Sequence, residues 1–467
     1  RNFKSYSGIY YYKNTIFEFH FLFHSINIYL YYNYLIMSKN FVEELRWRGM
    51  LHDITPDTEE FLLSNKTRGY IGFDPTADSL HIGSLVQIII LMHFQNYGYS
   101  PIVLLGGATG MIGDPSGKND ERKLLDTEAL ENNIDSIRSQ FQRFLDFKSG
   151  KKNSAILIDN YEWMKNFSLI DFSREIGKNI TVNYMMAKDS VKKRLAGESK
   201  GGISFTEFTY QLIQGYDFLH LYDNYDCKIQ MGGSDQWGNI TTGTELIRRK
   251  SKGKAYAITC PLITKADGTK FGKTLDGNIW LDKKRTSVYK FYQYWLNTSD
   301  EDASSYIKIF TFLELSLIEK IIKKHSNAPH LRVLQFELAY FVTELVHGKE
   351  ELNKVKRASN ILFGKDTSKS LMKIDSSTFV EIFEGVPQAE FSKKILNEGL
   401  SIISALSNET GFLKSNSEAR RSLKEKSISV NKLKVSEDYN LTISDLIGDQ
   451  FILLQRGKKN YFVLKFN

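Results

Sequence analysis

Two short apolar segments separated by one long apolar stretch constrain the fold of this chain more than any other feature. RGYIGF (residues 68–73) and PIVLLGG (residues 101–107) are bounded by turn residues and are typical of buried strands. Between them, LHIGSLVQIIILMHFQNYG predicts a helix that ends at Gly98. Strands joined through a crossover helix run parallel. The same alternation of apolar runs, Gly-rich turns and amphipathic stretches continues from Met37 to about Ile263, which predicts an α/β domain with a parallel sheet.

Four further regions follow this domain. Residues 286–362 place apolar side chains at three- and four-residue steps, which predicts a small helical domain. Residues 264–285 form a polar loop and connection, and residues 363–411 include GKDTSKSLMKIDSS, which indicates a linker. Residues 412–467 are basic and change from a helix-like to a strand-like pattern, which predicts a small α+β domain.

Composition narrows the class of protein. A chain of 467 residues is long enough for two or three domains, and the net charge of +8 favours a polyanionic partner. Cys227 and Cys260 lie far apart without metal-ligand spacing, which argues against a disulfide framework. We therefore expect a cytoplasmic protein without a metal site of its own.

Residues 1–36 differ from the rest of the chain, because they are crowded with Tyr, Phe, Ile and Asn and contain no initiator Met. Residues 16–36 are roughly long enough to span a bilayer, but Glu18, His20 and His24 interrupt the apolar run. A mitochondrial presequence would need more Arg and Ser, and a secretory signal would need a small-residue cleavage site. We therefore expect Met37 to be the start, residues 1–36 to be upstream sequence, and no membrane association.

The first chemical candidate is the start of the predicted helix. His81, Gly83 and Ser84 fall in its first turn, after a Pro-containing turn. Unpaired N–H groups and the helix dipole favour an anion there. His81 can donate to a phosphate, and Gly83 would let a nucleotide approach the backbone. A histidine at a helix start is more often structural, so this pattern needs a second one.

The second candidate is TKADGTKFGKT, residues 264–274. Gly268 and Gly272 make the loop flexible, and the ammonium groups of Lys270 and Lys273 can neutralise a triphosphate leaving group. Loops of Lys and Gly are common, so the two patterns are informative only together.

Together they resemble a known family. HIGS resembles the HIGH element and KFGKT the KMSKS element of class I aminoacyl-tRNA synthetases. The segments YIGFDPTADSLHIG, GGATGMIGDPSG, GISFTEFTYQLIQGYDF and GGSDQWGNI are similar to those of bacterial-type tyrosyl-tRNA synthetases. The resemblance covers nearly all of residues 37–467 and departs from the HIGH element at Ser84, which replaces a second histidine. A hydroxyl is still a donor, so we expect activity.

The resemblance implies a Rossmann-like catalytic domain, an α-helical anticodon-binding domain and a C-terminal RNA-binding domain. It also implies a homodimer, on which one tRNA reaches both subunits. The substrates would be L-tyrosine, ATP with Mg²⁺, and tRNA(Tyr), with no prosthetic group. The tyrosine carboxylate would attack the α-phosphate of ATP, and a terminal ribose hydroxyl of the tRNA would then accept the tyrosyl group.

Tyr70 and Asp217 are the pair that we expect around the substrate phenol. A carboxylate and a hydroxyl arranged for the phenolic O–H would be left unpaired by phenylalanine. The rejection can reach roughly ten-thousand-fold or more, and tyrosyl-tRNA synthetase is itself the reference case for this effect. Such a site needs no editing domain.

The remaining expected roles follow the resemblance. Tyr210, Gln214 and Asp217 lie at i, i+4 and i+7, on one face of a helix. The ammonium group of tyrosine is expected at Asp114, Tyr210 and Gln214, and its carboxylate near Gln236. The residues expected to bind ATP are Asp74, Gly83, Gly232, Asp235 and Lys273. The residues expected around the reacting phosphates are Thr76, His81, Ser84, Lys118, Arg122, Lys270, Lys273 and Thr274.

The basic residues of the tail are candidates for RNA binding. They lie on a predicted helix and at a turn beside Tyr461, although a solvated basic face is the simpler interpretation. The residues concerned are Arg420, Arg421, Lys424, Lys458 and Lys459.

Two other functions remain open on the sequence. A tryptophan-specific synthetase would share the architecture, but an indole needs no partners arranged for a phenol. A synthetase-derived RNA-binding or splicing protein without aminoacylation would keep the basic tail. The intact HIGS and KFGKT elements favour catalysis over this alternative.

Overall fold

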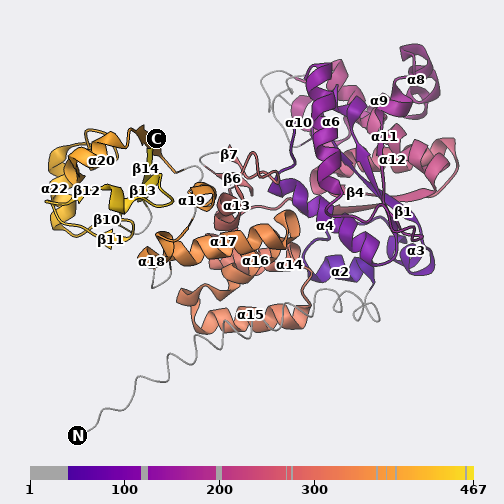
Figure 1. Cartoon of the computed structure of the whole chain (residues 1–467). Helices are drawn as coiled ribbons and strands as arrows, with labels where there is room; N and C mark the ends of the chain where they lie inside the picture. The colour runs from indigo at the N-terminus through magenta and orange to yellow at the C-terminus, as the bar shows by residue number, and fades with distance from the viewer. Residues whose placement is uncertain are drawn as a thin grey trace, which may run out of the picture. The chain divides into compact units, whose positions relative to one another are not determined.

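The computed structural model describes residues 40–116, 125–195, 202–269, 271–274, 277–363, 367–374, 376–383, 386–457 and 460–467. The expectations for residues 1–36 lie outside these ranges. The chain forms two compact units (Figure 1). Unit 1 comprises the chain up to Thr76 together with Gln87–Leu262, and unit 2 comprises Ala77–Val86 together with Ile263–Asn467. The helix α4 (Ile82–Asn96) belongs to both units.

Unit 1 contains the predicted parallel sheet. All its neighbouring strands pair in parallel, in the order β3-β2-β1-β4-β5. The strands are β1 (Arg68–Phe73), β2 (Ser100–Leu105), β3 (Ile156–Asp159), β4 (Cys227–Gly233) and β5 (Tyr256–Cys260). The helices of the described part are α2 (Phe41–Trp47), α3 (Thr58–Ser64), α4, α5 (Gly107–Gly110), α6 (Thr127–Phe141), α7 (Tyr161–Met164), α8 (Leu169–Glu175), α9 (Val182–Met186), α10 (Asp189–Leu195), α11 (Phe205–Tyr225) and α12 (Trp237–Lys250), with the short 3-10 helices η1 (Gly177–Asn179) and η2 (Ser234–Gln236).

Helices cover both faces of this sheet. A Cβ at Gly69 would lie 2.8 Å from Cζ of Phe94, so α4 packs closely against one face of β1. The ring of the next residue, Tyr70, lies 5.4 Å from that of Phe218 in α11. Successive side chains of a strand point to opposite faces. The domain is therefore a three-layer α/β sandwich, as the sequence predicts.

The strand order determines where a ligand can bind. The chain winds from β1 outward to β2 and β3, and then returns to place β4 on the other side of β1. In doubly wound sheets, ligands bind at the carboxyl ends of the strands that flank this reversal. The candidate site of unit 1 is therefore at the ends of β1 and β4.

The helix α11 is defined by a strong start signal. The Ser204 side chain accepts a hydrogen bond from the Glu207 N–H, and the Glu207 carboxylate accepts one from the Ser204 N–H. These two reciprocal bonds form a capping box. Glu207 also forms a buried ion pair with Arg194, at 2.6 Å. The helix ends where Asp226 adopts a left-handed conformation with φ 51°.

Unit 2 begins with the expected helical domain. Its core is rich in aromatic side chains, including Phe291, Trp295, Tyr306 and Phe310. The helices are α13 (Val288–Leu296), α14 (Asp300–Ile309), α15 (Leu315–Asn327), α16 (Val333–His347) and α17 (Lys349–Phe363), with the 3-10 helix η3 (Pro329–Leu331). The segment before them forms the two-residue strands β6 (Lys273–Thr274) and β7 (Gly277–Asn278).

The C-terminal part of unit 2 is a small α+β domain. Its sheet has the order β11-β10-β13-β14-β8, in which β8 and β14 pair in parallel and the other pairs are antiparallel. Its strands are β8 (Gln388–Phe391), β9 (Leu400–Ser401), β10 (Ile428–Val430), β11 (Leu433–Lys434), β12 (Asn440–Leu441), β13 (Phe451–Arg456) and β14 (Asn460–Phe466). Its helices are α18 (Thr367–Leu371), α19 (Ser376–Ile382), α20 (Lys394–Glu398), α21 (Ile402–Leu406) and α22 (Asn416–Lys424), with the 3-10 helix η4 (Ile443–Asp445).

The structure differs from the linker that we predict over residues 363–411. Strand β8 pairs with β14, and Leu396, Leu400 and Ile402 are buried in the core of the C-terminal domain. Leu371 and Phe379 pack in a second cluster with Phe451. The polar composition of residues 364–377 led to the linker prediction, because their few apolar side chains pack only against strands that follow later in the chain.

None of the helices in the described ranges combines the length and apolarity that a membrane span requires.

Candidate active site

The carboxyl ends of β1 and β4 bring polar residues together in unit 1. Asp74 directly follows β1, whereas Asp235 and Gln236 follow the two glycines that end β4. Side chains of α11 and of the segments after β2 and β3 complete the group. Such a group can hold a small zwitterion and a nucleoside, because it contains several carboxylates and amides in a largely buried place.

Asp217 is a buried acid of this group with a shifted pKa. Its side chain is buried, its Oδ2 accepts from Asn160 Nδ2 at 2.9 Å, and its Oδ1 accepts from Trp163 Nε1 at 2.9 Å. Burial raises the pKa of Asp217 to about 7, although these two hydrogen bonds oppose the rise. The carboxyl group is thus held in a fixed orientation by two neutral donors and retains lone pairs for a third.

Tyr70, which is on β1, lies beside Asp217 of α11. Burial, and secondarily the charge of Asp217, raises the pKa of Tyr70 well above its usual value, so its hydroxyl stays protonated. The Oη atom is buried and makes no hydrogen bond to any described residue. An orphaned buried hydroxyl costs free energy, so it indicates a partner that binds there. The structure therefore brings this predicted pair together.

Asp74, Tyr210 and Thr109 form a second polar cluster. The Tyr210 hydroxyl donates to Asp74 Oδ2 at 2.8 Å, and Thr109 Oγ1 donates to Asp74 Oδ1 at 2.7 Å. Tyr210 and Asp217 lie on the same helix, α11, as the sequence spacing predicts. Gln214 lies between them and is half-buried.

Asp114 anchors a third cluster. Its Oδ2 accepts from Gln236 Nε2 at 2.6 Å, and its Oδ1 accepts from the backbone N–H of Ser116 at 2.9 Å. Asn239 Nδ2 lies 3.3 Å from Gln236 Oε1 and 3.4 Å from Asp114 Oδ1, which ties α12 to the same group. Asp114 and Gln236, which are 122 positions apart in the sequence, are thus direct partners.

The glycines that end β4 leave little room beside them. A Cβ at Gly233 would lie 2.5 Å from Asp235 Oδ1, and one at Gly232 would lie 3.1 Å from Ile240 Cδ1. Burial, and secondarily the charge of Asp114, raises the pKa of Asp235 above its ordinary value. These glycines therefore keep the turn tight, which holds Asp235 against the end of the strand.

Unit 2 carries the HIGS segment. His81 precedes the first residue of α4, and its Nδ1 accepts from the Gly83 N–H at 3.0 Å. A Cβ at Gly83 would lie 2.7 Å from His81 Cε1. Gly83 therefore makes room for the imidazole ring, a different reason from the nucleotide approach that we expect on the sequence. Ser84 is half-buried in the first turn, where its N–H donates to the His81 carbonyl at 2.9 Å.

The KFGKT segment is described in part. Lys273 and Thr274 form strand β6, but Lys270 lies outside the described residues, as do Lys118 and Arg122. Phe271 stacks on Phe310 with ring centroids 5.2 Å apart, so an aromatic side chain anchors the loop to the helical domain. In unit 1, Thr76 is exposed just after the β1 turn.

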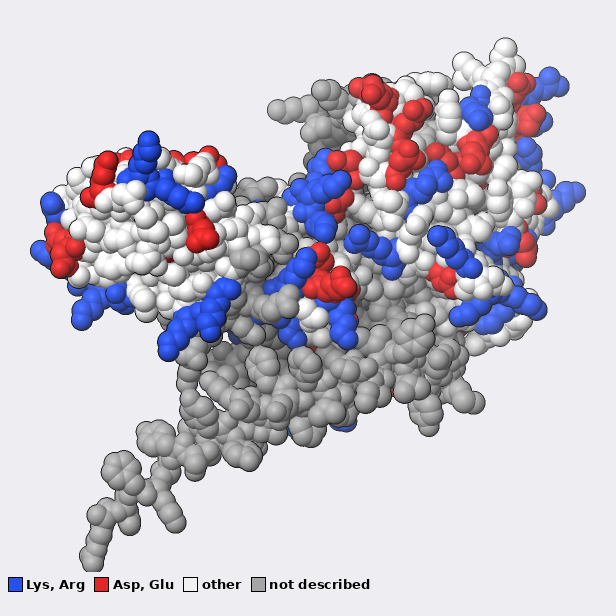
Figure 2. Space-filling view, in the orientation of Figure 1, with Lys and Arg blue, Asp and Glu red and all other residues white. Residues whose placement is uncertain are grey.

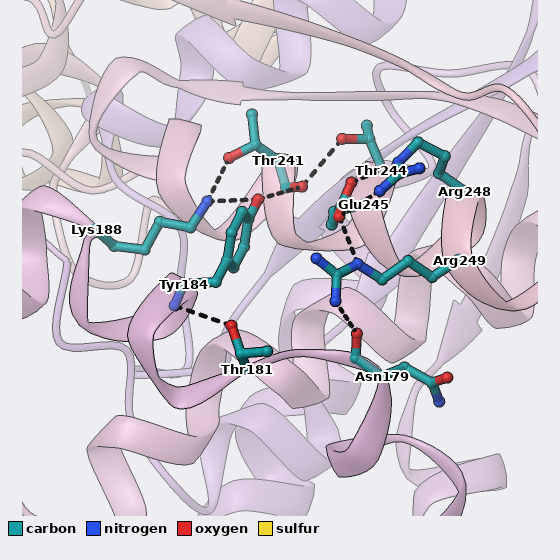
Figure 3. A network of polar contacts seen from close by, with 9 residues as sticks. All are labelled: Asn179, Thr181, Tyr184, Lys188, Thr241, Thr244, Glu245, Arg248 and Arg249. Atoms are coloured by element: carbon teal, nitrogen blue, oxygen red, sulfur yellow. Dashed lines mark hydrogen bonds and ion pairs between the residues drawn. The ribbon is translucent and has the colours of Figure 1, made fainter.

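A separate network links α9 to α12 in unit 1 (Figure 3). Lys188 Nζ donates to the Tyr184 hydroxyl and to Thr241 Oγ1, each at 2.9 Å. Burial lowers the pKa of Lys188 to about 8. Glu245 accepts from Arg248 at 2.8 Å and also from Arg249, whose Nη1 donates to the Asn179 carbonyl at 2.9 Å. The network fixes α9 and the adjoining loop against α12.

The candidate RNA-binding residues of α22 are exposed, but one is neutralised. Arg420 pairs with Glu437 at 2.9 Å, whereas Arg421 and Lys424 are exposed on the same helix. Lys458 and Lys459 lie outside the described residues. On the visible face of the C-terminal domain, Lys and Arg are interspersed with Asp and Glu rather than gathered in one patch (Figure 2).

Several residues of the site are missing from the sequence-based prediction. Asn160 and Trp163 hold Asp217, Thr109 binds Asp74, and Asn239 joins the Asp114 cluster. Asn160 and Trp163 directly follow β3, so the rule that ligands gather at the carboxyl ends of parallel strands could have indicated them. Thr109 follows the end of β2 in the same way, whereas Asn239 lies on the long helix α12, where a polar residue carries no comparable signal.

Comparisons with known proteins agree with this geometry. Residues 63–364 match the family described as tRNA synthetases class I (W and Y), and residues 378–464 match the tyrosine–tRNA ligase SYY-like C-terminal domain. The tyrosine–tRNA ligase of Flavobacterium johnsoniae is 63% identical over 429 residues, which is 91% of this chain and 99% of the relative. That of Bacteroides fragilis is 58% identical over 426 residues, with the same shares.

A solved structure is similar as well. The C-terminally truncated mitochondrial tyrosyl-tRNA synthetase of Aspergillus nidulans has a TM-score of 0.63 and 33% identity, and the match covers 70% of this chain and 95% of that chain. The chain therefore belongs to the tyrosyl-tRNA synthetases, within the class I tRNA synthetases.

Proposed function

We propose that this protein activates L-tyrosine with ATP and transfers the tyrosyl group to tRNA(Tyr), and that Asp217 selects the amino acid. The observation that carries the assignment is the buried Asp217 carboxyl group, oriented by Asn160 and Trp163 beside the Tyr70 hydroxyl. A phenolic O–H satisfies both groups, since it donates to the carboxylate and accepts from the hydroxyl. Neither an indole nor a phenyl ring offers this combination.

The other end of tyrosine is proposed to bind at the polar clusters of unit 1. The ammonium group needs acceptors, and Asp114, Tyr210 and Gln214 supply them. Gln236, which is held by Asp114, is proposed to bind the tyrosine carboxylate. Asp74 and the turn formed by Gly232 and Asp235 are proposed to bind the nucleoside, with the Asp235 carboxyl group at the ribose.

Catalysis requires no protein nucleophile. The tyrosine carboxylate attacks the α-phosphate of ATP, which forms tyrosyl-adenylate and releases pyrophosphate. Because Nδ1 of His81 accepts a hydrogen bond, the ring proton of its neutral form is on Nε2, which can donate to a phosphate oxygen. Donors set in place before the reaction stabilise the charge that develops in the transition state. Ser84 is proposed to add a hydroxyl donor.

The segments after Ser116 and around KFGKT are proposed to complete the phosphate site. Lys270 and Lys273 would neutralise the pyrophosphate, and Thr274 would add a hydroxyl donor, with Thr76 at its edge. Lys118 and Arg122 would contact it from the segment after Ser116. The substrate is expected to be MgATP, since Mg²⁺ binds chiefly phosphate oxygens and water. The C-terminal domain is proposed to bind tRNA through Arg420, Arg421, Lys424, Lys458 and Lys459.

Pyrophosphate exchange with each of the twenty amino acids tests the assignment. Exchange is expected with tyrosine and at least about a thousandfold more slowly with phenylalanine and tryptophan, because these leave buried polar groups unpaired. Exchange with tryptophan in place of tyrosine would redirect the assignment to the other member of the class. Binding of tRNA without any exchange would support a non-catalytic RNA-binding protein.

We also propose that the protein is a homodimer. The helix α8 has no buried residue. Two of its apolar side chains, Leu169 and Ile170, are 73% and 76% exposed. Phe205, the first residue of α11, is 72% exposed. Side chains of α8, α9 and α11 pack in or against one core, and each of these helices also carries exposed apolar side chains. A soluble monomer rarely leaves such a surface uncovered. The exposed apolar residues of this region are Leu169, Ile170, Val182, Met186, Leu195 and Phe205.

Phe205→Asp is expected to convert the dimer to a monomer, since it places a charge in the apolar contact. Sedimentation of the variant across a concentration range measures the change. Leu63→Asp is the matched control, because Leu63 is 64% exposed on α3 and outside this surface. Equal dimer content in both variants would rule out this surface as the interface.

We further propose that the enzyme works in the cytoplasm, where its two unpaired buried cysteines stay reduced.

A further inference from the structure

The HIGS segment is bound to the chain that follows the KFGKT segment. The Ile82 N–H donates to the Ile279 carbonyl at 3.0 Å, and the Leu281 N–H donates to the Leu80 carbonyl at 2.8 Å. These bonds place His81 and Trp280 directly opposite each other in an antiparallel bridge. Side chains opposite each other in such a pair project to the same face. The imidazole and the indole are therefore neighbours within unit 2.

The contact between the two rings is an edge-to-face one. Their centroids lie 6.1 Å apart with the planes at 65°, which is a favourable arrangement for two aromatic rings. The indole is itself restrained, because the Arg285 guanidinium lies over it at 4.7 Å and pairs with the Asp78 carboxylate. The backbone N–H of Trp280 donates to Thr286 Oγ1 at 3.0 Å, which holds the main chain at this residue.

The other side of His81 faces the backbone. The Gly83 N–H donates to Nδ1, and the space that a Cβ at Gly83 would need is taken by the imidazole. His81 is thus confined between the first turn of α4 and the indole of Trp280. A confined imidazole presents the Nε2–H in one direction.

We propose that Trp280 is a positioning residue for tyrosine activation and acts through His81. The inference rests on the role proposed above for His81. A donor that is already aimed loses little conformational entropy when charge develops on the phosphate, whereas a freely rotating ring must be ordered during the reaction. Trp280 does not touch the substrate in this scheme. Its effect is on the rate of adenylate formation and not on tyrosine binding.

A double-mutant cycle in the full-length protein tests the proposal. Trp280→Leu is expected to lower kcat of tyrosine-dependent pyrophosphate exchange about tenfold, the order of effect for loss of one aromatic contact. The KM for tyrosine and its equilibrium affinity are expected to change by less than about twofold. His81→Ala is expected to lower kcat about 100-fold, as for loss of one transition-state donor. In the His81→Ala background, Trp280→Leu is expected to have almost no further effect.

Trp280→Phe is the conservative variant, and we expect it to restore most of the rate because it keeps an aromatic edge beside His81. If the leucine variant unfolds at a lower temperature, all variants of the cycle are measured below that temperature, so that loss of folded protein does not enter the rates. Trp47→Leu is the matched control, because Trp47 is also half-buried beneath an arginine, Arg48 at 4.2 Å, but lies in unit 1. The kcat of the Trp47→Leu variant is expected to equal that of the parent protein.

The outcomes separate the two proposals. A tenfold loss that persists in the His81→Ala background, or a loss that appears in the tyrosine KM instead of kcat, would overturn the role of Trp280 and leave that of His81 intact. An unchanged kcat in His81→Ala alone would overturn both.

Discussion

Asp217→Ala is expected to lower the tyrosine-to-phenylalanine ratio of kcat/KM about 100-fold, because it removes the charged acceptor for the phenolic O–H. A hydrogen bond to a charged group contributes about 1.5–3 kcal/mol, and 1.36 kcal/mol corresponds to a factor of ten in rate. Phenylalanine never uses this bond, so its activation is expected to change much less. Pyrophosphate exchange with both amino acids in the same preparation gives the ratio.

The ratio is the informative quantity because the substitution also affects folding. Without Asp217, Trp163 Nε1 is left buried without its acceptor, which costs about 1–3 kcal/mol of stability. A loss of folded protein lowers both rates equally and leaves the ratio unchanged. Asp223→Ala is the control, since Asp223 is an exposed acid on the same helix. An unchanged ratio in Asp217→Ala would show that Asp217 does not contact the phenol.

The raised pKa of Asp217 gives the same site a pH signature. With a pKa of about 7, the carboxyl group of the ligand-free protein is mostly protonated at pH 6 and mostly ionised at pH 8. The phenol donates to the ionised form, so tyrosine binding favours it and releases a proton. Tyrosine affinity is therefore expected to rise about tenfold from pH 6 to pH 8, in proportion to the ionised fraction. Calorimetry in buffers of different ionisation enthalpy counts the released proton.

Removal of residues 364–467 is expected to lower tRNA charging about 1,000-fold or more while tyrosyl-adenylate formation stays within about threefold. Binding to a nucleic acid depends on many phosphate contacts together, so loss of the basic domain removes most of the affinity. The tyrosine and nucleoside residues proposed above all lie in unit 1. Aminoacylation and pyrophosphate exchange on the same truncated protein measure the two steps.

The structure determines where this truncation must begin. A deletion from Phe412 would leave β8 without β14 and would expose Leu396 and Leu400 of the same core. A deletion after α17 removes the whole domain. The remaining helical domain keeps its own aromatic core of Phe291, Trp295, Tyr306 and Phe310, which supports independent folding of the remainder. Equal loss of both steps would mean that the domain stabilises the catalytic part instead of binding RNA.

A milder variant distinguishes these explanations in the full-length chain. Arg421→Ala with Lys424→Ala removes two exposed cations of α22 without disturbing the core. It is expected to raise the KM for tRNA and to reduce the dependence of that KM on salt, because fewer counterions are released on binding. Tyrosine activation by this variant is expected to be unchanged.

Local patterns predict the elements of the catalytic domain correctly. The run from Arg68 to Leu105 predicts β1, α4 and β2, because strand and helix periodicities are properties of neighbouring residues. The spacing of Tyr210, Gln214 and Asp217 predicts one helix face for the same reason. The linker prediction is wrong because apolar residues of 367–402 pack against strands that lie between Ile428 and Phe466, which a local sequence window does not include.

The sequence by itself therefore determined that a helix begins just after His81, downstream of a β-strand, and that Tyr210, Gln214 and Asp217 share one helix. Only the tertiary structure placed Asn160 and Trp163 on Asp217, Gln236 on Asp114, and Trp280 beside His81. The physical reason is that hydrogen bonds and ring contacts between distant segments depend on where the tertiary fold brings each segment. Local periodicity carries no information about those positions.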